Sequence, residues 1–183
     1  MYRALTALIF VVAAVLIAVQ IVDAERSRNP AGAGARLAGV WETLPLQWAL
    51  TSVRGNGRRK IAVFSDPNCP YCKDLEEKLA KLDDITVHIF PYAVLGPESV
   101  RQAKAVWCSN DRVRAWNELM FRRVMPQGSV DCENPIETLV EIGEKLGARG
   151  TPTWFLENGE RHTGTMRPEK LRAVLDAAVV SKR

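Results

Sequence analysis

The stretch FSDPNCPYCKDLE, residues 64–76, places Cys69 and Cys72 with two residues between them, shortly after an apolar run. The run KIAVFS, residues 60–65, contains β-branched residues and is bounded by turn-forming residues, which predicts a buried strand. Residues 70–82 predict a helix, because their leucines recur at the three- and four-residue spacing of one helix face. The cysteine pair is therefore expected where a strand gives way to a helix.

The remaining pattern predicts an α/β fold with a helical insertion. Residues 85–92 predict a second strand, which completes a strand–helix–strand unit whose two strands should be parallel. Residues 46–53 fit either a strand or a pair of helical turns. The dipeptide Asn158-Gly159 predicts a hairpin turn, and Pro168 opens a last helix. The other expected elements are helices at about residues 97–109, 111–123 and 135–147, and strands at 151–157 and 160–164.

The composition is that of a globular protein. Of the 183 residues, 47% are hydrophobic and 25% are charged, which argues against a disordered chain. The net charge is +4, and the basic residues stand in small groups such as residues 58–60. No aromatic residues alternate with these groups, as a base-stacking surface would require. We therefore expect no nucleic-acid partner and interpret these groups as solvated surface.

The first segment predicts export from the cytoplasm. Residues 4–22 form an uncharged run of 19 residues, whose helix would be about 28 Å long, close to the roughly 30 Å core of a bilayer. We expect a transmembrane anchor, with Arg3 favouring an inside amino terminus. Small residues at Val22 and Ala24 also fit a signal-peptide cleavage site, so removal of residues 1–24 stays the alternative.

Either interpretation places the rest of the chain outside the cytoplasm. The short basic flank favours a bacterial periplasm, where disulfide chemistry is available to cysteines. Residues 25–45 are rich in Ala, Gly and Arg and are expected to be a spacer. Residues 46–183 are expected to form the folded domain, tethered to the inner membrane or soluble after cleavage of the first segment.

The four cysteines allow a metal site, a structural staple or a redox centre. A structural zinc site needs four ligands, usually in two close pairs, and Cys108 and Cys132 do not form a second close pair. His88 and His162 lie in predicted strands and are interpreted as ordinary sheet histidines. Haem attachment needs His directly after the second cysteine, where this chain has Lys73. We therefore expect no metal and no cofactor.

Redox chemistry suits Cys69 and Cys72 better than a staple, because so short a loop restricts the unfolded chain little. Cys69 is expected at the first helical turn, which Pro70 suits, and free amide N–H groups there stabilise an anion. It is therefore the expected nucleophile, a role that requires it to be accessible. Cys72 should be more buried and should resolve the mixed disulfide. Three early acids suit the helix dipole but oppose the thiolate: Asp74, Glu76 and Glu77.

Two segments together resemble the thioredoxin superfamily, and most closely the bacterial DsbC/DsbG thiol:disulfide interchange proteins. The first is residues 64–73, which contain Cys-Pro-Tyr-Cys, and the second is Gly-Thr-Pro-Thr at residues 150–153, about 80 residues later. The resemblance covers residues 46–183. It implies a thioredoxin-like fold with a helical insertion.

The resemblance also implies roles for residues around the cysteines. Pro152 would be cis and face the cysteine pair, and Thr151 would offer backbone hydrogen bonds to a bound peptide. Pro70 and Tyr71 complete the expected substrate-binding set. The alternative without a functional role is that Thr151-Pro152 forms an ordinary turn at the start of a strand.

Further implications concern the other two cysteines and nearby acids. The family often carries a second, non-catalytic disulfide, which implies a Cys108–Cys132 bond, with buried free thiols as the alternative. Thioredoxins carry a buried acid that aids proton transfer six residues before the first active-site cysteine, where this chain has Val63. Asp66 is closer to the pair but is interpreted as a turn or cap residue and not as a base.

The expected activity is thiol–disulfide exchange on protein substrates through Cys69 and Cys72. The resemblance implies an isomerase or reductase kept reduced by a membrane electron donor of the DsbD kind. DsbC-type isomerases carry an N-terminal dimerisation domain, whereas an apolar segment and a spacer precede this domain, so dimerisation by that route is not implied. The alternatives are a thiol oxidase, a redox partner of one membrane assembly, or a thioredoxin-fold binding module with idle cysteines.

Overall fold

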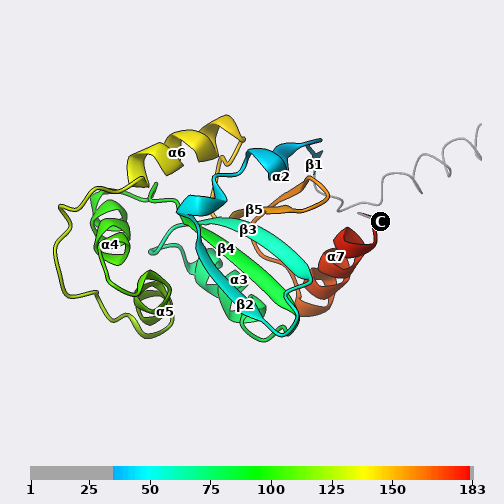
Figure 1. Ribbon diagram of the computed structural model, residues 1–183, viewed down its shortest axis with the longest axis horizontal. Coiled ribbons are helices and arrows are strands. Elements are labelled where there is room, and N and C mark those ends of the chain that lie inside the picture. Colours follow the sequence, from blue (N-terminus) through cyan, green and yellow to red (C-terminus); the bar gives the residue numbers. More distant parts are fainter. Residues whose placement is uncertain (1–34, 182–183) are drawn as a thin grey trace, which may run out of the picture. The chain divides into compact units, whose positions relative to one another are not determined.

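Six strands form a mixed sheet within residues 35–181, the part of the chain that the computed structural model describes (Figure 1). Their order across the sheet is β1-β6-β5-β3-β4-β2. Strands β3 and β4 are parallel, as predicted, and every other neighbouring pair is antiparallel. The strands are β1 Ala35–Arg36, β2 Leu50–Arg54, β3 Arg59–Ser65, β4 Ile85–Pro91, β5 Thr153–Leu156 and β6 Glu160–Thr163.

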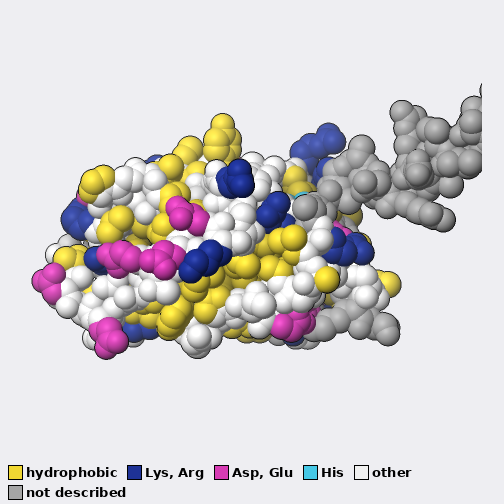
Figure 2. All heavy atoms as spheres, turned by 90° about the horizontal axis from the view of Figure 1, so that it is seen from above, with side chains coloured by type: hydrophobic (Ala, Val, Ile, Leu, Met, Phe, Trp, Pro, Cys, Tyr) yellow, Lys and Arg dark blue, Asp and Glu magenta, His cyan; other side chains and the backbone are white. Residues whose placement is uncertain are grey.

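Helices cover both faces of this sheet. Figure 1 shows α2 and α6 on one side, α3 and α7 on the other, and α4 with α5 beyond one end of the strands. Seen from the side of α6, charges of both signs are interspersed and apolar side chains form a band between them (Figure 2). The helices are α2 Val40–Thr43, α3 Pro70–Leu79, α4 Pro97–Trp107, α5 Arg112–Arg122, α6 Ile136–Lys145 and α7 Pro168–Val180, with a 3₁₀ turn at Leu46–Trp48.

The alternation of β3 explains why two layers of helices are needed. Ile61 and Val63 point to one face, where they join the leucines of α3 and α7 in one hydrophobic cluster. Ala62 and Phe64 point to the other face, where they join residues of α2 and α6. All four strand residues are fully buried. A strand that is apolar on both faces is stable only between two layers, so β3 is the central element that carries the site.

The folded unit begins earlier than the sequence analysis expects. Residues 25–45 were expected to be a spacer, yet β1 pairs with β6, and Val40, Trp41 and Leu44 are buried on the α6 side of the sheet. The reason is that these three apolar side chains pack in the same cluster as Phe64. The Ala-, Gly- and Arg-rich stretch before them suggested a spacer instead. The domain start at residue 46 is therefore corrected to residue 35 within the described range.

Element boundaries differ from expectation by a few residues. The stretch 46–53, which fitted a strand or helical turns, contains both, with the 3₁₀ turn leading into β2. Helix α3 ends at Leu79 and not at Leu82, because a turn follows in which the Leu82 N–H donates to the Leu79 carbonyl over 3.0 Å. Leu82 nonetheless stays buried at the end of the same face.

The helical insertion between β4 and β5 is joined by a disulfide. Cys108 ends α4 and Cys132 lies in the connection between α5 and α6, and their sulfur atoms are bonded at 1.98 Å. The pairing is the one that the resemblance implied. Between residues 35 and 181, no helix combines the length and the apolar character that crossing a membrane requires. The predicted span, residues 4–22, and the predicted cleavage site lie outside the described residues.

Candidate active site

Two free cysteines mark the start of α3. Cys69 is the N-cap residue, with an extended backbone, and Pro70 is the first helical residue, as the sequence predicted. The Lys73 N–H donates to the Cys69 carbonyl over 3.2 Å, so the helical hydrogen bonds begin at this residue. The amide N–H groups of the first turn have no partner within the helix and point toward its amino end. An anion at the Cys69 sulfur would therefore lie at the positive end of the helix dipole.

The two cysteines differ in exposure in the expected direction. Cys69 retains 5% of its accessible surface and Cys72 retains none. Cys69 is thus more enclosed than a freely exposed nucleophile. Of the two cysteines, it is nonetheless the one with solvent-accessible surface. Burial raises the pKa of the Cys72 thiol well above its usual range, and hydrogen bonds from Ser65 and from the Asp66 N–H, which lies 3.4 Å from Sγ, offset part of this effect.

The loop before β5 meets the start of α3. The Cys69 thiol donates to the Thr151 carbonyl over 3.3 Å, although the residues are far apart in sequence. The Thr151–Pro152 peptide bond is cis, which is the geometry that the resemblance implied. The Pro152 carbonyl accepts from the Gly164 N–H over 2.7 Å, which fastens this loop to the end of β6. The structure therefore brings together the cysteine segment and the Gly-Thr-Pro segment at a single place.

Asp66 is a structural residue of the turn between β3 and α3. Its carboxylate is fully buried and accepts four hydrogen bonds of 2.8–2.9 Å, as its position in a turn leads one to expect. The donors are the Asn68 N–H, the Ser99 hydroxyl, and the Val94 and Leu95 N–H groups. With its acceptor positions filled, Asp66 holds the cysteine turn against the 94–95 loop. This agrees with its interpretation as a turn residue.

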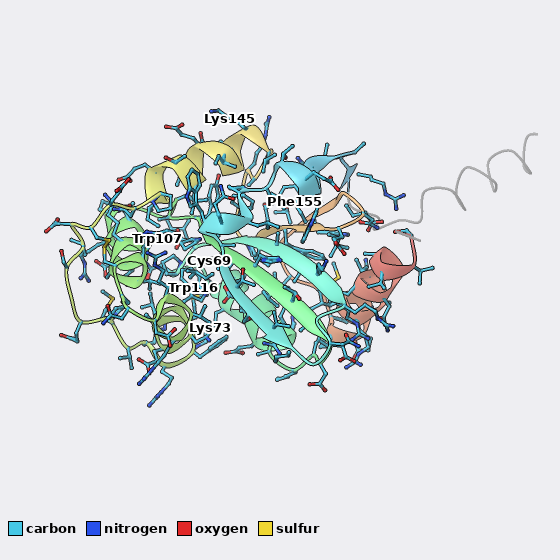
Figure 3. The ribbon with its side chains drawn as sticks, viewed as in Figure 1. Cys69, Lys73, Trp107, Trp116, Lys145 and Phe155 are labelled. Atoms are coloured by element: carbon cyan, nitrogen blue, oxygen red, sulfur yellow. A yellow bond between two sulfur atoms is a disulfide. The ribbon has the colours of Figure 1, made fainter. Side chains whose placement is uncertain are left out.

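The surface around Cys69 is partly apolar. Tyr71 is 63% exposed, and Val94 and Leu95 are exposed on the neighbouring loop. A cavity of about 520 Å³ lies beside Thr151 and is lined by residues including Val94, Leu95 and Arg149. Figure 3 shows Cys69 where the sheet meets the helical insertion, and the Asn68 amide donates to Ser99 of α4 over 2.9 Å at that junction. Of the expected substrate-binding set, Pro70 and Tyr71 are exposed, Thr151 is half-buried and Pro152 is buried.

Glu76 was not predicted as a residue of the site. It was grouped with Asp74 and Glu77 as an acid that suits the helix dipole, but its side chain is buried, on the same face of α3 as Cys72. Ser65, at the end of β3, donates to its carboxylate over 2.5 Å. The signal was present, since Glu76 follows Cys72 by four residues and so lies on the same helix face. The apolar pattern of the helix does not include Glu76, because the pattern counts only its leucines.

Comparison with known proteins gives a consistent family. The model of the thioredoxin-like domain family matches residues 46–179. The "Probable thiol:disulfide interchange protein DsbC" of Bordetella avium is 43% identical over 129 residues, 70% of this chain and 46% of that protein. The "Thiol:disulfide interchange protein DsbC" of Escherichia coli K12 is 30% identical over 120 residues, 63% of this chain and 50% of that protein. The chain thus spans about half the length of these relatives.

A solved structure shows the same likeness over nearly its whole length. The crystal structure of a disulfide interchange protein from Neisseria gonorrhoeae aligns with a TM-score of 0.70 at 38% identity, covering 74% of this chain and 99% of that one. Residues 46–179, which the family model matches, hold the strand–helix–strand unit, both cysteines and the loop before β5. From the family match and this likeness, the chain belongs to the thioredoxin-like family and is a homologue of the DsbC thiol:disulfide interchange proteins.

Proposed function

We propose that this chain catalyses thiol–disulfide exchange on protein substrates in a bacterial periplasm, as a DsbC-like isomerase or reductase. The observation that carries the proposal is the position of Cys69, a free thiol at the N-cap of α3 whose sulfur lies 3.3 Å from the Thr151 carbonyl. The helix end stabilises a thiolate, and the adjoining loop offers backbone groups to an extended peptide. The homologues named as thiol:disulfide interchange proteins support the same chemistry.

In the proposed reaction, the Cys69 thiolate attacks one sulfur of a substrate disulfide. A mixed disulfide forms, and the other substrate sulfur leaves as a thiolate that takes up a proton. In the reductase direction, the Cys72 thiolate then attacks the Cys69 sulfur, which forms the Cys69–Cys72 disulfide and releases the second substrate thiol. The substrate gains two electrons and the cysteine pair loses two. In the isomerase direction, a different thiol of the substrate displaces Cys69, so no net oxidation occurs.

The substrate-binding residues are proposed from the same geometry. Thr151 and Pro152 border the cysteine pair, and exposed Tyr71 offers an aromatic surface next to Pro70. An unfolded segment presents both the backbone groups and the apolar side chains that such a surface binds. We expect the electron donor to be a DsbD-like membrane protein, and residues 4–22 to serve either as the membrane tether or as a cleaved signal.

Trapping tests this function. In cells that carry Cys72→Ala, Cys69 should accumulate as mixed disulfides with substrate proteins that are released by reductant, and the double variant Cys69→Ala/Cys72→Ala should trap none. The purified wild-type protein should reduce insulin with dithiothreitol as the donor. Absence of both trapping and insulin reduction would leave a binding module as the better explanation.

The direction of the reaction follows from the resting state of the pair. Alkylation of thiols in acid-quenched cells should find Cys69 and Cys72 reduced if the chain serves as an isomerase or reductase. An oxidised pair in the same cells would overturn that assignment in favour of a thiol oxidase. Cys108 and Cys132 should be oxidised in either case and provide the internal reference.

A further inference from the structure

Three side chains join α3 to the segment between β6 and α7, and the reaction described above does not use them. The Thr165 hydroxyl donates to Oδ2 of Asp74 over 2.6 Å. The Lys78 ammonium donates to the same oxygen over 2.6 Å and to the Thr165 hydroxyl oxygen over 3.0 Å. The hydrogen bonds from Lys78 and Thr165 lower the pKa of Asp74, so its carboxylate is ionised at neutral pH. Each member of this cluster is therefore bonded to the other two.

The residue before Thr165 holds a loop of the site. The Gly164 N–H donates to the Pro152 carbonyl over 2.7 Å, and the Gly164 carbonyl accepts from the Trp154 indole N–H over 2.9 Å. Gly164 has a φ of 79°, in the left-handed region that glycine adopts without steric cost. Asp74 is thus connected to the loop before β5 through two consecutive residues of the chain.

Two contacts of α3 bear on how the loop before β5 lies relative to the nucleophilic sulfur. One is the hydrogen bond of the Cys69 thiol to the Thr151 carbonyl, over 3.3 Å. The other is the hydrogen bond between Thr165 and Asp74, which follows Cys69 on the same helix. A helix has about 3.6 residues per turn, so the two contacts lie less than two turns apart on one rigid element. Both therefore hold the loop against the start of α3.

The two contacts differ in whether they survive the proposed chemistry. A cysteine donates a hydrogen bond through its S–H group, and Cys69 has no such hydrogen once it forms a mixed disulfide. Its hydrogen bond to Thr151 is therefore lost in the state in which a peptide is covalently attached and the loop has to stay beside the sulfur. Asp74 and Thr165 exchange neither electrons nor protons with the substrate, so this step leaves their hydrogen bond unchanged.

We propose that Asp74 is a positioning residue, which acts through Thr165 to keep the loop before β5 beside Cys69 after the thiol has reacted. The proposal rests on the proposed function and adds a residue to its site. It implies that substrates which bind the backbone groups of the loop depend on Asp74. A small disulfide that touches only the sulfur depends on Asp74 much less, because a misplaced binding group costs orientation and not reactivity.

The cluster is exposed enough for its loss to leave the fold intact. The side chain of Asp74 is 45% exposed and that of Lys78 is 20% exposed, and exposed ion pairs contribute little to global stability. Strand β6 stays paired with β5 without the cluster, since Thr163 lies opposite Thr153 in their own ladder. Effects on peptide reactivity and on folding can therefore be measured separately.

Two activated disulfides with the same leaving group test this dependence. One carries a methyl group, and the other carries an unstructured peptide that is joined through its central cysteine. In both, Cys69 bonds to the substrate sulfur, and the electron pair of the broken bond leaves on a coloured pyridinethiolate. A Cys72→Ala background stops the reaction at the mixed disulfide. Asp74→Ala should lower the rate constant with the peptide, divided by that with the methyl reagent, about tenfold.

Matched variants separate the hydrogen bond from other effects of the substitution. Thr165→Val removes the hydroxyl but keeps the shape of the side chain, and should lower the ratio as Asp74→Ala does. Thr165→Ser keeps the hydroxyl and should restore the ratio. Combining Asp74→Ala with Thr165→Val should add nothing, because each change alone removes the same bond. Glu77→Ala removes an exposed carboxylate from the same helix and should keep the wild-type ratio.

Amide hydrogen exchange tests whether the contact holds the loop after Cys69 has reacted. Alkylation of Cys69 with iodoacetamide removes the thiol hydrogen, as a mixed disulfide does. In the alkylated wild type, the Gly164 N–H should stay protected, because it still donates to the Pro152 carbonyl. In alkylated Asp74→Ala, its exchange should be faster than in the same variant before alkylation.

The outcomes distinguish a failed positioning role from a failed function. A wild-type ratio in both Asp74→Ala and Thr165→Val overturns the proposal while leaving the proposed function intact. Equal slowing with both reagents also overturns it, because the cluster would then act on the thiol or on the fold and not on the peptide. If Cys69 reacts with neither reagent and the wild type does not reduce insulin, the proposed function fails. Circular dichroism confirms that the variants are folded, and the methyl reagent provides an internal check of the thiol.

Discussion

The sulfur of Cys69 lies 3.3 Å from the carbonyl oxygen of Thr151, although one residue begins α3 and the other precedes β5. This contact joins the two segments that resemble thioredoxins and places the free thiol of Cys69 next to backbone groups that suit an extended peptide. Cys72 lies on the inner side of the same helix end, fully buried. The difference between the two thiols leads to the first prediction.

Alkylation should distinguish the cysteines by position. Iodoacetamide added to the reduced, folded protein should modify Cys69 first, because Cys72 has no accessible surface and burial raises its pKa. Mass spectrometry of proteolytic fragments would locate the label, and urea should then allow Cys72 to react as well. Labelling of Cys72 ahead of Cys69 in the folded protein would contradict the assignment of nucleophile and resolving cysteine.

Glu76 should make stability depend on pH in a defined direction. Burial raises its pKa from 4.5 in the unfolded chain to about 7 in the folded protein, so the folded state binds the proton more tightly. The contribution of Glu76 to stability should therefore fall as pH rises from about 4.5 to about 7 and stay constant above that range. The difference between the two pKa values corresponds to about 3 kcal/mol.

Urea unfolding across this pH range measures the effect. Glu76→Gln is neutral at every pH, so it should remove this slope and become more stable relative to the wild type as pH rises. Glu77→Gln, which changes the exposed neighbour, should keep the slope of the wild type. Parallel curves for the wild type and Glu76→Gln would show that the carboxylate ionises in the folded state as easily as in the unfolded chain.

The Cys108–Cys132 disulfide should stabilise the fold without taking part in exchange. It closes a segment with a sequence separation of 24, which corresponds to about 3 kcal/mol in the chain-entropy description. Replacing both cysteines by alanine should lower the free energy of unfolding by about that amount. The variant should still reduce insulin at a temperature where it is folded. Loss of exchange in a folded variant would instead implicate this disulfide in the reaction.

Trp41 tests the corrected start of the folded unit. It is 7% exposed and packs with His88, at 5.9 Å between ring centroids, on the α6 side of the sheet. Trp41→Ala should cost about 3–5 kcal/mol of folding free energy, as is usual for a buried aromatic side chain. Val53→Ala, at a strand position that is 60% exposed, provides the comparison and should change stability little. A negligible effect of Trp41→Ala would support a spacer that extends to residue 45.

The sequence was most informative where one local pattern had one structural solution. The apolar run before Cys69 predicted β3, the leucine spacing predicted α3, and their order required β4 to be parallel to β3. The cis bond before Pro152 followed only from resemblance, because Thr-Pro by itself also fits an ordinary turn. The interaction of Cys69 with Thr151 depends on the whole sheet and has no local signal.

The burial of Trp41 and of Glu76 was not predicted, because the neighbouring residues in the sequence suggested a linker and an exposed helix face. Trp41 follows a stretch rich in Ala, Gly and Arg that suits a linker, and its burial depends on the apolar face of the sheet against which it packs. Glu76 stands between two acids that are more exposed, so its charge suggested the surface. Its burial depends on Ser65 and Trp116, which come from another strand and another helix and supply the hydrogen bonds that make a buried carboxylate tolerable.

The four hydrogen bonds accepted by Asp66 have a consequence for recognition. A single carboxylate fixes both the turn that carries Cys69 and the backbone of Val94 and Leu95. The two sides of the proposed binding surface are thus held in a fixed arrangement in the absence of a peptide. An incoming chain loses its own conformational freedom on binding but does not have to order the surface that receives it. A substrate segment that binds there as proposed would therefore meet a surface whose shape is already set, which lowers the entropic cost of binding.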